Sequence, residues 1–196
     1  MNQNIEKQIF EYLSQHLSSK KVEHSYNVSM LAVKIALKND TNLLKARIAS
    51  LLHDCAKFMS DEELVKFFRG HQSIKYFREI VNFSPQLLHS FASEIIARKN
   101  FKIKDRDILN AIKYHTLGRE NMSVLEKIVF VADSVSLDRH WRRSAEIKKL
   151  AKNSLNVAFF EVLKEKIGYV VKNGNWLCQQ TICTWNWYVS NIKKSS

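Results

Sequence analysis

The chain has 196 residues, which is enough for one well-buried domain and does not require a second. One proline and four glycines argue against a turn-rich all-β fold and favour long helices, while the formal net charge of +12 indicates attraction to polyanions. No apolar stretch approaches the roughly 20 residues that span a bilayer, and the first residues lack a signal pattern. Three cysteines without a CxxC spacing indicate reduced thiols, so we expect a cytoplasmic protein without a membrane partner.

Apolar residues recur at helical spacing along the first half of the chain. The helices expected there cover 3–18, 21–38, a stretch capped by Asp40 or Thr41 that ends at His53-Asp54, and a helix opened by a capping box at Ser60. His24 falls on the apolar stripe of the second helix, so its side chain is expected to face inward.

Helical spacing continues through the second half. The ranges expected to be helical are Pro85 to about residue 98, Asp105 to His115, a helix opened by a capping box at Ser123 with Asp133 on its buried side, 144–168, and 176–193. We therefore predict an all-α, single-domain helical bundle over residues 1–196, in which the helices of 144–193 pack on a core at about 20–140. The aromatic-rich last helix is expected in the core or at the surface of a homodimer.

Four histidines and two aspartates lie on these apolar stripes or at helix ends: His24, His53, Asp54, His89, His115 and Asp133. Each alone could be a hydrogen-bonded core histidine or a capping aspartate. Burying all six without a partner would be costly, whereas histidine nitrogen and carboxylate oxygen suit iron, manganese or zinc. Six ligands exceed what one ion with an open position needs, so the sequence predicts two divalent metal ions, with Asp54 as the bridging ligand.

The other candidate metal ligands are weaker. Cys55 lies two positions from His53 and points to a different face if the segment is helical, so we do not expect it to bind metal. His16, His71 and His140 lie in polar stretches and are expected at the surface.

Two metal ions about 3.5–4 Å apart can activate a bridging hydroxide for attack on phosphorus. Lys57 lies one helical turn beyond His53-Asp54, and the guanidinium of Arg119 is suited to bind phosphate bidentately. Arg139 is a further candidate for substrate binding. An ordinary surface cation is the alternative for each of these three residues.

The ordered histidines and aspartates resemble the HD-domain phosphohydrolase superfamily. Within it, residues 52–57 and the more specific stretch 113–133 resemble the YqeK family, and Thr181 and Asn186 fit its C-terminal helix, so the resemblance covers essentially the whole chain. The family commonly has an acidic residue and a proline after the last aspartate. This chain has Val135-Ser136-Leu137-Asp138-Arg139 instead, a difference that bears on fine specificity.

The resemblance implies an all-helical HD-domain enzyme with a di-iron-type centre that hydrolyses diadenosine tetraphosphate symmetrically to two ADP. It also implies roles for nine residues: His24, His53, Asp54 and Asp133 would hold one metal, His89 and His115 with Asp54 would hold the other, and Lys57, Thr116 and Arg119 would contact the phosphates. Three alternatives stay open. They are an HD-domain enzyme for another nucleotide (a monophosphate, a guanosine alarmone or a cyclic dinucleotide), a basic helical nucleic-acid-binding protein without a recognised motif, and a scaffold with satisfied core histidines.

Overall fold

The structure is a computed structural model that describes residues 2–69, 74–138 and 142–192. Within these ranges all regular secondary structure is helical, which confirms the predicted all-α fold. The helices in chain order are α1 (Asn2–His16), α2 (Ser19–Lys38), α3 (Leu43–Leu52), α4 (Asp61–Phe67), α5 (Phe77–Phe83), the 3-10 helix η1 (Pro85–Leu88), α6 (His89–Asn100), α7 (Arg106–Tyr114), α8 (Val124–Val135), α9 (Ser144–Asn153), α10 (Leu155–Lys172) and α11 (Gln179–Ile192). No helix in the described ranges is long and apolar enough to cross a membrane.

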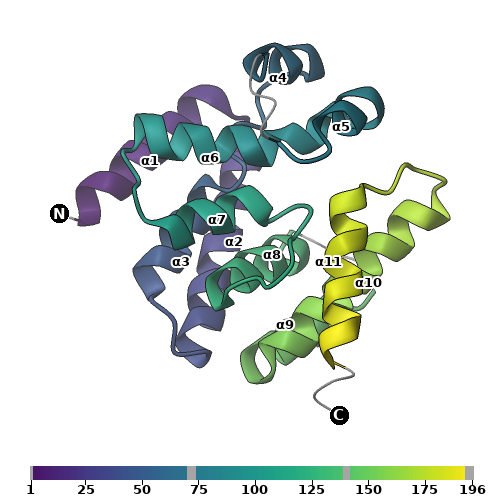
Figure 1. Cartoon of the computed structure of the whole chain (residues 1–196). Coiled ribbons are helices and arrows are strands. Elements are labelled where there is room, and N and C mark those ends of the chain that lie inside the picture. The colour runs from purple at the N-terminus through teal and green to yellow at the C-terminus, as the bar shows by residue number, and fades with distance from the viewer. Residues whose placement is uncertain (1, 70–73, 139–141, 193–196) are drawn as a thin grey trace.

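Helix α8 is the central element of the fold (Figure 1). It packs against α2, α3 and α7 on one side and against α9 and α10 on the other. Most of its side chains are buried, and Phe130 packs on Phe159 of α10 with ring centroids 4.9 Å apart. A helix with apolar residues on most of its sides belongs in a core, which explains why α8 is enclosed by its neighbours.

Capping residues determine several helix ends. Both predicted capping boxes form, at Ser60 and at Ser123. The predicted cap of α3 at Asp40 or Thr41 is wrong, because the side chain of Asn42 accepts the hydrogen bond from the Lys45 amide.

Helix α5 lies in a stretch where no helix was predicted, and the remaining differences concern helix ends and one interruption. The segment that follows Pro85 begins as a 3-10 turn and becomes α-helical only at His89. The expected helix 144–168 is interrupted at Ser154, whose extended backbone (φ −150°, ψ 83°) separates α9 from α10.

The aromatic residues of α11 pack within the chain. Trp185 stacks on Phe160 of α10 at 4.8 Å between ring centroids, and buried Tyr188 contacts Phe159 at 4.6 Å. The aromatic residues of the last helix are therefore explained by packing within the chain. A homodimer stays a prediction.

Helix α11 also holds the loop that follows α7. Buried Gln180 donates to the Gly118 carbonyl at 2.6 Å, and the Thr181 hydroxyl donates to the Leu117 carbonyl at 3.3 Å. Gly118 itself has a φ of +68°, and a Cβ there would lie 2.9 Å from Thr184 Cγ2. Glycine is therefore required both for the backbone conformation and for the close approach of α11.

Gly118→Ala should lower the free energy of unfolding by about 2–3 kcal/mol, because it adds left-handed strain and an overpacked contact. The measurement is urea denaturation followed by circular dichroism. Two matched controls separate the causes. Gly174 has a φ of +64° but open space around an added Cβ, so Gly174→Ala should lower the free energy of unfolding by only about 1 kcal/mol. Gly168→Ala lies in α10 with open space and should be neutral or stabilising by up to about 1 kcal/mol. Equal effects at all three positions would contradict this account.

Candidate metal centre

The structure brings the six predicted ligands together from five segments of the chain. They lie on α2 (His24), in the turn after α3 (His53 and Asp54), at the start of α6 (His89), directly after α7 (His115) and on α8 (Asp133). They form two groups that could each hold a metal ion and that share Asp54. We call His24, His53, Asp54 and Asp133 the first group, and Asp54, His89 and His115 the second group.

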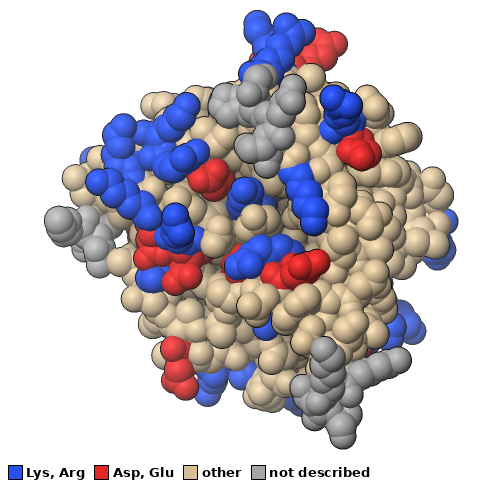
Figure 2. All heavy atoms as spheres, in the orientation of Figure 1, with Lys and Arg blue, Asp and Glu red and all other residues tan. Residues whose placement is uncertain are grey.

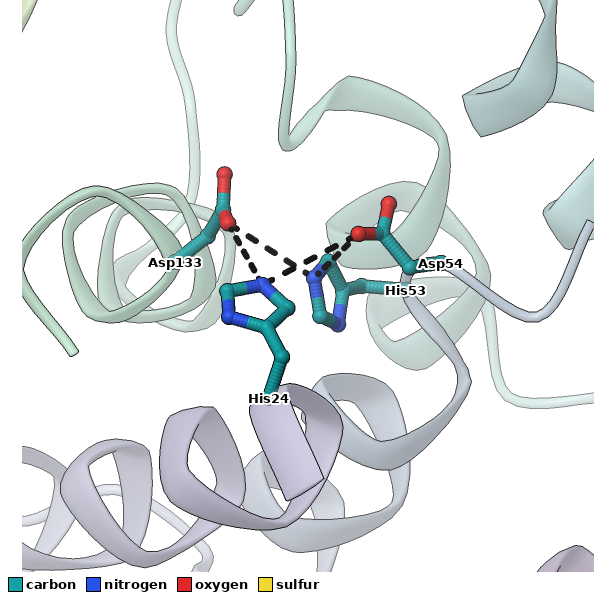
Figure 3. A group of neighbouring side chains, drawn as sticks. All are labelled: His24, His53, Asp54 and Asp133. Carbon is teal, nitrogen blue, oxygen red and sulfur yellow. Dashed lines mark hydrogen bonds and ion pairs between the residues drawn. The ribbon is translucent and has the colours of Figure 1, made fainter. Parts of the chain in front are cut away.

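The first group converges on one point between α2, α8 and the turn after α3 (Figure 3). His24 Nε2 lies 3.2 Å from Asp133 Oδ1, and His53 Nε2 lies 3.2 Å from Asp54 Oδ2. The cross distances are 3.7 Å from His53 to Asp133 and 3.9 Å from His24 to Asp54. Ligands that each lie about 2.1 Å from one ion are at most about 4.2 Å apart, so these spacings fit a single cation.

The second group uses the other oxygen of the shared carboxylate. Asp54 Oδ1 lies 3.2 Å from His89 Nε2 and 3.3 Å from His115 Nε2, and these two nitrogens are 3.3 Å apart. The Thr116 hydroxyl lies 2.9 Å from His115 Nε2 and borders this group. Because Oδ2 faces the first group and Oδ1 the second, Asp54 has the geometry of a bridging ligand.

Three of the histidine rings are oriented by carbonyls of the helix that directly precedes each of them. The Nδ1–H groups of His53, His89 and His115 donate to the carbonyls of Ser50, Gln86 and Ile112, each three residues earlier, at 2.5–2.7 Å. A carbonyl can only accept, so Nδ1 carries a proton and Nε2 faces the neighbouring ligands, with a lone pair when the ring is neutral. This is the tautomer that a metal ion requires, and hydrogen bonds of this kind fix the rings of metal-binding histidines.

The fourth histidine, His24, is oriented by Asp138, which was not among the predicted site residues. His24 Nδ1 lies 2.6 Å from Asp138 Oδ2, and the Ser136 hydroxyl donates to Asp138 Oδ1 at 2.6 Å. His24 and Asp138 are 114 residues apart, so no local spacing could connect them. The available signal was chemical: Asp138 is an acidic side chain just beyond Asp133 in a basic chain.

The centre contains two buried carboxylates, whose negative charges suit a bound cation. Burial opposes ionisation of Asp54, but the charge of His53 and the close approach of the His89 and His115 imidazoles hold the pKa of this carboxyl well below its usual range. Burial lowers the pKa of His115 to about 4, whereas His53, despite its burial, has its pKa raised to about 9 by Asp54 and Asp133. Within the described ranges, the buried atoms His53 Nε2 and Asp54 Oδ1 lack a hydrogen-bond partner. Two buried carboxylates and unpaired ligand atoms fit divalent metal ions.

Two predicted phosphate contacts lie beside the ligands. Lys57 Nζ lies 2.7 Å from Asp54 Oδ2, and Thr116 borders the second group as described above. An ammonium group in contact with the shared carboxylate is well placed for an incoming anion, so the predicted role of Lys57 is consistent with its position. Arg139 lies outside the described residues.

Arg119 has a different partner from the one its predicted role requires. Its Nε and Nη2 donate to the two carboxylate oxygens of Glu126 at 2.7 and 2.8 Å, and Nη1 donates to the Glu120 carbonyl. Glu126 is fully buried and belongs to the capping box of α8, so its charge needs a cation. The bidentate face of Arg119 is therefore used within the fold, and a role in binding phosphate stays a prediction.

Arg119→Ala should lower the free energy of unfolding by about 2 kcal/mol, because it leaves the buried Glu126 carboxylate without its main partner. Arg98→Ala is the matched control, since Arg98 pairs with Glu94 while its own side chain is 55% exposed. It should change the free energy of unfolding by no more than about 0.5 kcal/mol. Urea denaturation of both variants checks this, and equal effects would show that Arg119 is an ordinary surface cation.

Of the weaker candidates, Cys55 and His16 lie in the described ranges and belong to neither group. Cys55 is buried, its thiol donates to the Ser93 carbonyl, and burial raises its pKa to about 12, so its chemistry is that of a core residue. His16 is exposed and stacks on Tyr12. His71 and His140 lie outside the described residues.

Lys166 of α10 also lies beside the ligands, although the sequence did not indicate it. Its ammonium lies 3.9 Å from Asp133 Oδ2, 3.4 Å from the His115 carbonyl oxygen and 4.1 Å from the centroid of the Phe130 ring. It follows His115 by 51 residues, in a helix that shows only ordinary amphipathic spacing.

Comparison with known proteins agrees with this geometry. The model of the HD domain family matches residues 22–138, a range that contains all six ligands. The chain belongs to the HD domain family.

Relatives of similar length carry the same name in two bacteria. The chain is 31% identical to the symmetrical bis(5'-nucleosyl)-tetraphosphatase of Bacillus subtilis, over 91% of this chain and 94% of that protein. It is 32% identical to the protein of the same name from Halalkalibacterium halodurans, over 87% of this chain and 90% of that protein. A crystal structure from Clostridium acetobutylicum, described as a predicted HD superfamily hydrolase involved in NAD metabolism, superposes with a TM-score of 0.89 at 36% identity, over 94% and 97% of the two chains.

The shared carboxylate of this HD domain leads to a test of ligand roles. Asp54→Asn should remove both metal ions, because it weakens a ligand of both groups, whereas His89→Ala should remove mainly the ion of the second group. The measurement is elemental analysis of freshly purified protein, expressed as metal per chain. Loss of one ion in both variants would contradict the bridging role of Asp54.

Proposed function

We propose that this HD-domain protein is a metal-dependent hydrolase that cleaves diadenosine tetraphosphate symmetrically into two ADP. The observation that carries the proposal is the pair of ligand groups joined by Asp54, with its two oxygens 3.2–3.3 Å from ligands on either side. The relatives named symmetrical bis(5'-nucleosyl)-tetraphosphatase support the choice of substrate.

The side chains of the centre suit a substrate with several negative charges. Lys57 contacts the shared carboxylate and Thr116 borders the second group, so both can bind phosphoryl oxygens beside the ligands. Divalent ions bound there would supply Lewis-acid stabilisation of the phosphoryl charge and a lowered pKa for bound water. The bridging hydroxide stays a prediction, as do the number of ions and their identity as iron rather than manganese.

The surface charge is consistent with a polyphosphate substrate. Figure 2 shows Lys and Arg gathered at the upper left, over the end of α6 and the loop into α7, where the sequence has Arg98, Lys99, Lys102, Lys104 and Arg106. Acidic residues lie close by, and Lys45 pairs with Asp105 and Asp107. The patch would favour encounter with anions at low salt, and its mixed charges give no specific support to nucleic-acid binding.

The test is incubation of the metal-loaded protein with diadenosine tetraphosphate and chromatography of the products. ADP alone is expected, and AMP plus ATP would refute symmetric cleavage. A panel of NAD, nucleoside monophosphates, guanosine alarmones and cyclic dinucleotides separates the alternatives; NAD is included because of the description of the Clostridium relative.

Matched aspartate variants connect turnover to the metal centre. Asp54→Asn should reduce turnover at least about 100-fold, because removal of a metal ligand or its partners has effects of this size. Asp107→Asn makes the same chemical change at a 55% exposed carboxylate and should retain wild-type turnover. Unchanged turnover in Asp54→Asn, or salt-sensitive nucleic-acid binding without any turnover, would favour the other classes.

A further inference from the structure

A large cavity opens directly from the metal centre. Its volume is about 790 Å³, within the range of small-molecule binding sites, and its lining is mainly apolar. Asp133 of the first group and Thr116, which borders the second group, line one part of it. The rest is lined by α10, by the segment between α10 and α11, and by the end of α5 with the residues after it. We call it the α10 cavity.

The α10 cavity carries a pair of stacked aromatic rings. The Phe83 and Trp176 rings lie 5.3 Å apart between centroids with only 20° between their planes. They come from the end of α5 and from the segment between α10 and α11, which lie side by side in Figure 1. Phe83 is 63% exposed and Tyr169, which also lines the cavity, is 68% exposed. Such exposed rings at a cavity are typical of a binding surface.

A cation also lines the α10 cavity. Lys166 contacts Asp133 and the Phe130 ring, as described above, and its side chain is 31% exposed. The lining therefore combines a predicted metal ligand, an ammonium group and a stacked aromatic pair. A nucleoside polyphosphate carries the matching groups on one molecule, since its phosphates bind cations and metal while its base presents a flat face.

We propose that the α10 cavity binds one nucleoside of the substrate, with the base against the Phe83–Trp176 pair and Lys166 on the phosphate chain. The assignment rests on the proposed function for its substrate class. Continuity with Asp133 supports a small molecule that reaches the reacting phosphates, in place of a protein segment docked on exposed apolar residues. Stacking on aromatic side chains tolerates every base, so this cavity would bind adenine and guanine nucleotides with similar affinity.

The test compares two probes that share their phosphates, ADP and pyrophosphate, by calorimetric titration of the metal-loaded full chain. Trp176→Ala and, separately, Phe83→Ala should weaken ADP binding about tenfold and leave pyrophosphate binding within about twofold of wild type. Trp176→Phe keeps a ring and should restore most of the ADP affinity. Phe67→Ala is the matched control, because Phe67 is an exposed ring on α4 that does not line the cavity, and it should bind both probes as wild type does.

Three results would overturn the proposal: absence of ADP binding by wild type, unchanged ADP affinity in both alanine variants, or equal loss of ADP and pyrophosphate affinity in both. Retained pyrophosphate binding also shows that the variants are folded. The readout is independent of turnover. If wild type does not cleave diadenosine tetraphosphate while Trp176→Ala selectively loses ADP, the proposed function fails and the nucleoside site stands. If wild type cleaves it and the variants bind ADP normally, only the nucleoside site fails.

Discussion

The carboxylate of Asp54 is the feature on which the rest of the centre depends. It is almost fully buried, and each of its oxygens faces a different set of imidazole nitrogens. A buried carboxylate is unfavourable unless charge or hydrogen bonds compensate for lost hydration. The fold must therefore bring α2, α6, α7 and α8 to within ligand distance of the turn after α3. The same helix packing therefore builds the centre and compensates the buried charge of Asp54.

Helix α8 connects that requirement to the hydrophobic core. It supplies Asp133 from a helix whose other side chains are mostly buried, so the ligand cannot move without disturbing the core. At its first turn the helix holds Glu126, which pairs with Arg119 in the loop that follows Thr116. The same loop is held by Gln180 from α11. The C-terminal helix thus takes part in positioning the edge of the metal centre.

The sequence was sufficient to predict most of the helices and the six candidate ligands that the structure brings together, because both follow from local periodicity and residue chemistry. His24 and Asp133 lie on apolar stripes, where a polar ligand is conspicuous. Asp138 and Lys166 were missed because their contacts join segments far apart in the chain, where local spacing gives no guide. The ion pair of Arg119 with Glu126 was also not predicted, since nothing in the sequence indicates which anion a guanidinium will bind. Sequence periodicity therefore predicts helices and their buried faces, but not the tertiary contacts of charged side chains.

The hydrogen bonds from Nδ1 to carbonyls three residues earlier have a consequence for metal affinity. The last carbonyls of a helix lack partners within it, so a histidine at the helix end satisfies one of them while its ring is held in a single rotamer. These side chains then lose their rotational entropy during folding, so that loss does not weaken metal binding. The centre is preorganised: an arriving ion meets ligands already in place, and exchange of one metal for another requires little movement of the protein.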